Sequence, residues 1–169
     1  MSQALKKLRS LHFEHWRRQY PAIEEKYYPR PTYQVSKANG LTRAIIDFIR
    51  FNGGQAERIS SEGRVIDKRQ TVTDVIGRVK TIGSVQRTYS STTNGTSDLS
   101  AIIPDRATGI GRSVKIEVKV GKDRQSEAQK AYQEAVTRAG GIYYVARDFE
   151  AFVEWYNQTF GSKEGGGNG

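Results

Sequence analysis

The chain has 169 residues, enough for one folded unit with its own core. Lysine and arginine outnumber aspartate and glutamate by 27 to 18, which gives a formal net charge of +9 and favours a polyanionic partner, with nucleic acid first and an ordinary basic surface as the alternative. The sequence has no cysteine, which excludes structural disulfides and thiolate zinc sites. It has no apolar run long enough to span a membrane. We therefore expect an intracellular, cytoplasmic protein.

The first forty residues are predicted to form a basic amphipathic arm and a linker. Residues 2–20 have helical spacing, with Leu5, Leu8 and Trp16 along one stripe. Three prolines and the Asn-Gly pair at 39 and 40 interrupt regular structure before the main domain, which we place at 41–160. The basic side chains of the arm are candidates for phosphate contact, with a solvated face as the alternative: Lys6, Lys7, Arg9, Arg17 and Arg18.

The main domain begins with a helix predicted from Leu41 to about Phe51. Short strands are predicted in "AERIS" and "RVID". Residues 68–97 are rich in Thr, Ser, Gly, Arg and Lys without a firm period, which predicts a long basic excursion with one or two weak strands. Candidates for phosphate contact in this part of the chain, again with a solvated surface as the alternative, are Arg64, Lys68, Arg69, Arg78, Lys80 and Arg87.

Two strands, 98–103 and 114–120, are predicted to form a hairpin. If the turn is centred near Thr108 and Gly109, Ile103 pairs with Val114.

The last part of the chain alternates helix and strand. Ser126 is predicted to begin a helix through about Ala139, with Gln129 at capping-box spacing. The strand "GIYYVAR" and a helix capped by Asp148 complete the domain, and 161–169 is predicted to be a flexible Gly-rich tail. The whole pattern indicates an α/β fold with a central mixed β-sheet flanked by helices.

Strand 114–120 carries the residues that point to chemistry. Its valines and Ile116 share one face, while Glu117 and Lys119 share the other. The predicted hairpin places Asp98 opposite Lys119 and diagonal to Glu117, so two carboxylates and a lysine converge. Carboxylates bind Mg²⁺ or Mn²⁺, which supports phosphodiester hydrolysis when a lysine orients the attacking water or stabilises developing charge. The alternative is a solvated sheet surface.

Four separated elements resemble the PD-(D/E)XK nuclease superfamily, and within it the VRR-NUC branch. They lie in "GTSDLSAII", "VKIEVKVGKDRQSEAQKAY" and "AGGIYYVAR", and members of that branch often show Gly-x-x-Asp, Glu-Val-Lys, Ser-Glu-x-Gln and Ala-Gly-Gly in this order. The resemblance covers about residues 41–155 and implies a restriction-endonuclease-like core. Where the familiar pattern has Pro-Asp, this chain has Ser97 and Asp98, which should affect local turn geometry more than chemistry.

The resemblance also implies roles for individual residues. Asp98, Glu117 and the backbone carbonyl of Val118 would bind Mg²⁺ or Mn²⁺, and Lys119 would be the catalytic lysine. Gln129 would face the active site from its helix, a role compatible with capping.

Several further residues have weaker support. By resemblance, Lys122 and Arg124 would approach the phosphodiester, with an ordinary charged loop as the alternative. Many members of the superfamily carry an extra acid on the first helix, and here the candidates are Asp47, which could simply pair with Arg43, and Glu57. Without either acid, a one-metal mechanism is expected.

The resemblance implies a metal-dependent DNA endonuclease that acts on branched or flapped DNA, including a Holliday junction. Related small nucleases often act as dimers, which implies a homodimer. Two alternatives stay open, namely a non-catalytic DNA-binding scaffold on the same fold and a restriction-type nuclease with a recognition element within 68–97.

Overall fold

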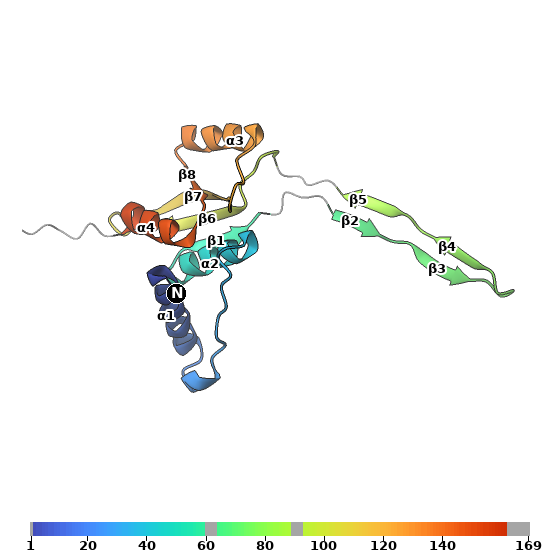
Figure 1. Cartoon of the computed structure of the whole chain (residues 1–169), viewed down its shortest axis with the longest axis horizontal. Coiled ribbons are helices and arrows are strands. Elements are labelled where there is room, and N and C mark those ends of the chain that lie inside the picture. Colours follow the sequence, from blue (N-terminus) through green and yellow to red (C-terminus); the bar gives the residue numbers. More distant parts are fainter. Residues whose placement is uncertain (1, 60–63, 89–92, 162–169) are drawn as a thin grey trace, which may run out of the picture. The chain divides into compact units, whose positions relative to one another are not determined.

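The computed structural model describes residues 2–59, 64–88 and 93–161, without the side chains of Arg64, Arg87 and Thr88. The chain forms two compact units rather than the single unit expected (Figure 1). The first unit comprises Met1–Ile59 and Gly95–Gly169, and the second comprises Ser60–Asn94. The predicted tail lies outside the described residues beyond Gly161.

The first unit is a mixed α/β structure, as predicted. Its central sheet has the strand order β1-β6-β7-β8, in which β1, β6 and β7 are antiparallel neighbours and β8 runs parallel to β7. A helix connects β7 to β8, as a parallel pair requires. The strands are β1 (Gln55–Arg58), β6 (Leu99–Pro104), β7 (Gly111–Val118) and β8 (Ile142–Ala146). The helices are α1 (Gln3–Gln19), the short 3-10 helix η1 (Glu25–Tyr27), α2 (Ala38–Phe51), α3 (Glu127–Arg138) and α4 (Phe149–Phe160).

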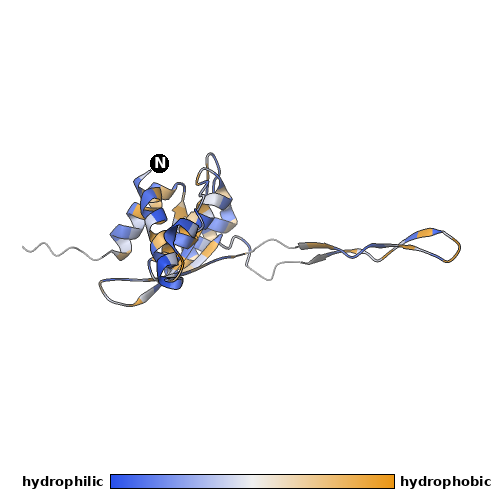
Figure 2. Cartoon of the chain, turned by 90° about the horizontal axis from the view of Figure 1, so that it is seen from below, coloured by the Kyte–Doolittle hydropathy of each residue, from blue (hydrophilic) through white to orange (hydrophobic). Residues whose placement is uncertain are grey.

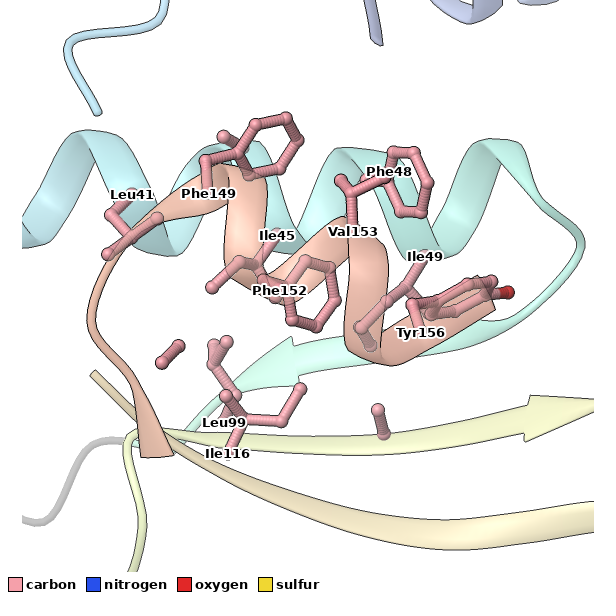
Figure 3. Close-up of a cluster of buried hydrophobic side chains, with 14 of the residues drawn as sticks. Leu41, Ile45, Phe48, Ile49, Leu99, Ile116, Phe149, Phe152, Val153 and Tyr156 are labelled. Atoms are coloured by element: carbon pink, nitrogen blue, oxygen red, sulfur yellow. The ribbon is translucent and has the colours of Figure 1, made fainter. Parts of the chain in front are cut away.

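One face of this sheet packs against α2 and α4 to form the core (Figure 3). Leu99 and Ile116 point from the sheet toward these helices, and the ring of Phe48 meets the rings of Phe152 and Tyr156 edge-on. The last helix is present as predicted, and its apolar stripe faces the core, since all of the stripe's members are buried: Phe149, Phe152, Val153, Tyr156 and Phe160. Because side chains alternate along a strand, the opposite face of the sheet is left for polar residues and α3.

Helix α1 packs against α2 and α4 and so belongs to the first unit. Ala4, Leu8 and His12 are its buried residues. The predicted stripe is confirmed in part, because Leu8 is buried and Leu5 packs against the core, whereas Trp16 is only partly buried. Ala4, Leu8 and His12 are four residues apart, so one side of the helix covers the core.

Helix α2 begins three residues earlier than predicted. The backbone N–H of Leu41 donates to the carbonyl of Lys37 at 2.9 Å, so the Asn-Gly pair lies inside the first turn. A Cβ on Gly40 would overlap the carbonyl of Gln34. The glycine thus allows the preceding chain to lie against the helix, whereas the sequence pattern suggested a break.

The second unit is a two-stranded antiparallel ribbon. Its strands are β2 (Arg64–Asp67), β3 (Gln70–Thr73), β4 (Val79–Ile82) and β5 (Val85–Thr88), with β2 paired to β5 and β3 to β4. One register holds throughout, since Val65 lies opposite Arg87 and Val72 opposite Lys80. Residues 68–97 contain three strands, β3, β4 and β5, where one or two weak strands were predicted. The sequence showed no firm period there because β3 and β4 are exposed along their full length and have no buried face to impose alternation.

Candidate active site

The hairpin of β6 and β7 brings the two predicted carboxylates together, in a register that differs from the predicted one. Leu99 lies opposite Ile116 and Ile103 opposite Arg112, not Val114. The centre of the turn lies one residue earlier than expected, so the partner of each β6 residue lies two positions earlier in β7 than predicted. An even shift leaves each side chain on its predicted face. Extended by one residue, the register places Asp98 opposite Glu117 instead of Lys119.

Asp98 is fixed by backbone hydrogen bonds on both of its neighbouring strands. Its Oδ2 accepts a hydrogen bond from the N–H of Val118 at 2.8 Å, and its carbonyl accepts one from the N–H of Ile59 at 2.8 Å. Ser97, the residue before Asp98, is buried and donates its hydroxyl to the carbonyl of Leu99 at 3.0 Å. The residue before Asp98 therefore has a local structural role.

Glu117 is the most deeply buried charged residue described, with 1% of its surface exposed. Its Oε1 lies 3.0 Å from Nζ of Lys119 and also accepts a hydrogen bond from the side-chain amide of Gln129. Burial raises the pKa of the Glu117 carboxyl, and the charge of Asp98 adds to that effect, while Lys119 and Tyr143 oppose it. This part of the strand is not a solvated face, so the alternative of an ordinary sheet surface is wrong.

Lys119 bridges Glu117 and the turn that follows the strand. Its Nζ also lies 3.4 Å from Oδ2 of Asp123. Burial lowers the pKa of this amine, but the hydrogen bonds and charges of Glu117 and Asp123 outweigh burial, so the pKa is raised. Lys119 therefore carries a positive charge beside two carboxylates.

The first turn of α3 completes the cluster. The predicted capping box is confirmed, since Ser126 Oγ accepts from the N–H of Gln129 and Gln129 Oε1 accepts from the N–H of Ser126. The Nε2 of Gln129 then reaches Glu117, so both structural expectations for this residue are satisfied together. A Cβ on Gly95 would overlap the carbonyl of Ala128. Gly95 thus permits the loop before Asp98 to lie against the start of α3.

The remaining predicted site residues take different positions. The backbone N–H of Val118 donates a hydrogen bond to Asp98. Because the N–H and C=O groups of an extended residue point to the same side, the carbonyl of Val118 also faces the strand that Asp98 precedes. Lys122 and Arg124 are exposed in the turn on either side of Asp123, which pairs with Lys119.

Of the two additional acids, Asp47 lies on α2, and Glu57 lies on β1, next to the strand that Asp98 precedes. Asp47 accepts a hydrogen bond from the hydroxyl of Tyr33 at 2.9 Å and lies 3.8 Å from Arg43, as a surface partner would. Glu57 is exposed on β1 opposite Ser100. Ser100 is two residues after Asp98, so Glu57 lies diagonally across from Asp98 on the sheet.

The predicted phosphate-contact residues of the ribbon belong to the second unit. Lys68 is exposed, whereas Arg69 is bound to both carboxylate oxygens of Asp67 at 2.9 and 2.7 Å. The backbones of Arg64 and Arg87 lie in β2 and β5, and their side chains are outside the described structure.

Sequence reasoning missed three polar contacts on this face. Tyr143 of β8 lies with its hydroxyl 3.5 Å from Oε2 of Glu117, Asp123 pairs with Lys119, and Nζ of Lys115 donates to the hydroxyl of Ser100 at 2.6 Å. The register of the parallel β7–β8 pair sets the position of Tyr143, and sequence alone does not give that register.

The donor set includes the ligand types of a hard divalent cation. Asp98 and Glu117 supply carboxylate oxygens and Val118 a carbonyl, the ligand types that Mg²⁺ and Mn²⁺ prefer. Within residues 2–59, 64–88 and 93–161 there is no cluster of three or more His, Asp or Glu side chains that could hold a metal ion, so water or substrate oxygens would have to complete the coordination shell.

Comparisons with protein-family models, curated proteins and solved structures give no match to this chain. Among the helices described, none has the length and apolar character needed to cross a bilayer.

Proposed function

We propose that the protein is a metal-dependent DNA endonuclease whose active site is the cluster of Asp98, Glu117, Lys119 and Gln129. The observation that carries this proposal is the burial of Glu117 beside Asp98 in a chain with net charge +9. Two neighbouring carboxylates repel each other and repel a phosphodiester, and a divalent cation between them would remove both conflicts.

Each residue of the cluster has a role that its contacts support. A bound Mg²⁺ or Mn²⁺ would polarise the phosphoryl group and lower the pKa of a coordinated water. Asp98, Glu117 and the carbonyl of Val118 would hold that ion. Lys119, with an ammonium held by Glu117 at 3.0 Å, would orient the attacking water or stabilise negative charge on the phosphoryl oxygens.

Gln129 is a positioning residue in this proposal. Its amide fixes one oxygen of Glu117 and is itself fixed by the capping box, which limits the rotamers open to the carboxylate. The side chains of Lys122 and Arg124, which are exposed in the same turn as Asp123, would contact the DNA backbone.

The fold supports the proposal in general terms. A mixed sheet with helices on both faces, and a carboxylate pair contributed by a β-hairpin, is what resemblance to the PD-(D/E)XK superfamily and its VRR-NUC branch would lead one to expect. The substrate would be branched or flapped DNA, and the homodimer stays a prediction.

The test is cleavage of labelled four-way junction, flap, single-stranded and linear duplex DNA with Mg²⁺ or Mn²⁺. We expect cutting that EDTA abolishes and that falls at least about 100-fold in Glu117→Gln and Lys119→Met. The matched controls are Glu127→Gln on the exposed surface of α3 and Lys115→Met, a second lysine on the same face of β7. Both controls should stay within about threefold of the parent rate.

Two results would reject the proposal, and a third would change the type of nuclease proposed. Binding of all four DNAs without cutting under either metal would favour the scaffold alternative. Cutting that Lys115→Met reduces as much as Lys119→Met does would place the chemistry elsewhere on the sheet. Cutting confined to one linear sequence would favour a restriction-type nuclease.

A further inference from the structure

The loop that closes the β-ribbon exposes two aliphatic side chains at a position where polar residues are usual. Val75 and Ile76 occupy the centre of the turn between β3 and β4, and their exposed fractions are 104% and 69%. Turn positions of this kind ordinarily carry Asn, Asp, Ser, Pro or Gly. Figure 2 shows hydrophobic colouring at this loop.

The turn holds these two side chains in a fixed geometry. Oδ1 of Asp74 accepts hydrogen bonds from the N–H groups of Ile76 and Arg78, at 3.0 and 2.8 Å, and the carbonyl of Asp74 accepts from Gly77 at 3.0 Å. Gly77 has φ +79, which suits the position after a type I turn in a three-residue hairpin loop. The sequence therefore builds an ordered tip and places valine and isoleucine on it.

Some basic side chains of the ribbon have no acidic partner among the described residues. Its two described acids are both used internally, since Asp67 binds Arg69 and Asp74 caps the turn. Lys68, Arg78 and Lys80 have no ion-pair partner among the described residues. The ribbon thus presents positive charge with little local compensation, which matches a polyanion.

The pairing of β3 with β4 places apolar and basic groups on the same face. Val72 lies opposite Lys80 and Gln70 opposite Ile82, so these four side chains share one face, and no acid is among them. An isolated two-stranded ribbon is only marginally stable in water. Exposed aliphatic groups interleaved with a lysine and a glutamine suit a groove that offers phosphates at its edges and bases at its floor.

We propose that the ribbon is a groove-binding arm for duplex DNA and that Val75 and Ile76 wedge against a base step at its tip. A two-stranded ribbon fits a DNA groove, and proteins that kink DNA insert aliphatic side chains between base pairs. One strand of the ribbon, residues 64–74, spans roughly 35 Å at about 3.3 Å per residue, close to one turn of the duplex. This proposal concerns binding and does not rest on hydrolysis at Asp98 and Glu117.

The test uses the full chain carrying Glu117→Gln, in EDTA, with duplex and junction DNA that contain 2-aminopurine as a reporter of unstacking. We expect binding to raise the fluorescence of the reporter at one step. The variant Val75→Thr/Ile76→Thr keeps the β-branched shape and should lose that rise and at least about fivefold in affinity. Its control, Ile23→Thr/Ile110→Thr, replaces two exposed aliphatic side chains of the first unit and should behave as the parent.

The charge contribution is tested by salt dependence. Lys68→Gln/Lys80→Gln should reduce the slope of log K against log salt by about 2. Lys37→Gln/Arg138→Gln removes the same charge from exposed positions of the first unit and should leave the slope within about 0.5 of the parent.

Equal slopes in the two charge variants would overturn the proposal, as would an unchanged fluorescence rise in the tip variant. A tip variant that binds DNA normally but alters self-association, or binding to anionic vesicles, would assign the tip to a protein or a membrane instead.

Discussion

Asp98 accepts a hydrogen bond from the backbone N–H of Val118 at 2.8 Å, so one site carboxylate is held by the residue that follows the other, Glu117. The hairpin therefore sets the spacing of the two acids through the backbone. Side-chain rotamers alone do not determine it.

This relationship separates the structural role of Asp98 from its proposed chemical role. Asp98→Asn keeps an oxygen acceptor for the N–H of Val118, so we expect the free energy of unfolding to change by less than about 1 kcal/mol. Asp98→Ala leaves that N–H without its partner and should lower the free energy of unfolding by about 1–3 kcal/mol. Both variants should lose metal-dependent cutting. Urea unfolding and cleavage assays measure the two effects, and full activity of Asp98→Asn would contradict its role as a metal ligand.

Ser126 and Gln129 share a capping box but differ in their contact with Glu117. Ser126→Ala should lower the free energy of unfolding by about 1 kcal/mol. We expect the folded variant to keep cutting. Gln129→Ala should cause a similar loss of stability together with at least a tenfold loss of the cutting rate, on the order expected when a positioning contact is removed. Single-turnover cleavage at a temperature where both variants are folded makes the comparison. Equal rates would show that Gln129 acts only as a cap.

Gly95 is required by two separate features, its φ of +79 and its approach to Ala128. Gly95→Ala should therefore destabilise the protein by clearly more than about 1 kcal/mol. Gly53 has a similar φ of +88 with no atom near its missing Cβ, so Gly53→Ala reports the backbone contribution alone. Thermal unfolding of both variants gives the difference, and two equal shifts would mean that the loop does not lie against α3.

Partly buried tyrosines predict a loss of stability at alkaline pH. Burial raises the pKa of Tyr33, Tyr144 and Tyr156 above the ordinary value of about 10. Above that pH the unfolded chain releases these protons while the folded chain retains them, so the unfolded state binds fewer protons and stability falls as pH rises. Urea unfolding between about pH 9 and pH 12 should show this decline. Tyr33→Phe should make the decline shallower, and a flat profile would contradict the assignment.

Sequence patterns predicted elements where one side of an element is buried. The apolar stripe of α4 and the apolar residues of β7 both face the core. The order of apolar and polar residues in the sequence therefore matches the period of the helix and of the strand. Capping of α3 was predictable because Ser126 and Gln129 interact within one turn. The β-ribbon was predicted only in part, as a strand in "RVID" and one or two weak strands, because β3 and β4 have no buried face and the turn at Asp74 sets their register.

The candidate site was predictable in its residues but not in its pairing. The open end of the predicted hairpin carries Asp98, Glu117 and Lys119. Because side chains alternate along a strand, these three share one face and are predicted to lie near one another. The exact partner of Asp98 depends on how Asp105 and Ile110 close the turn, which involves a backbone hydrogen bond of 3.0 Å. Tyr143 comes from a parallel strand across a helical connection, and no local signal in the sequence sets that register.

The side chain of Gln129 carries two duties, since its oxygen caps α3 and its nitrogen holds Glu117. Fraying of the first helical turn would consequently release the carboxylate in the same event. Amide hydrogen exchange in the first turn of α3 should therefore change when the charge of Glu117 changes or when an ion binds to its carboxylate, although no residue of that turn lies in β7. Binding of a metal ion at the proposed site would therefore be linked to local unfolding at the start of this helix.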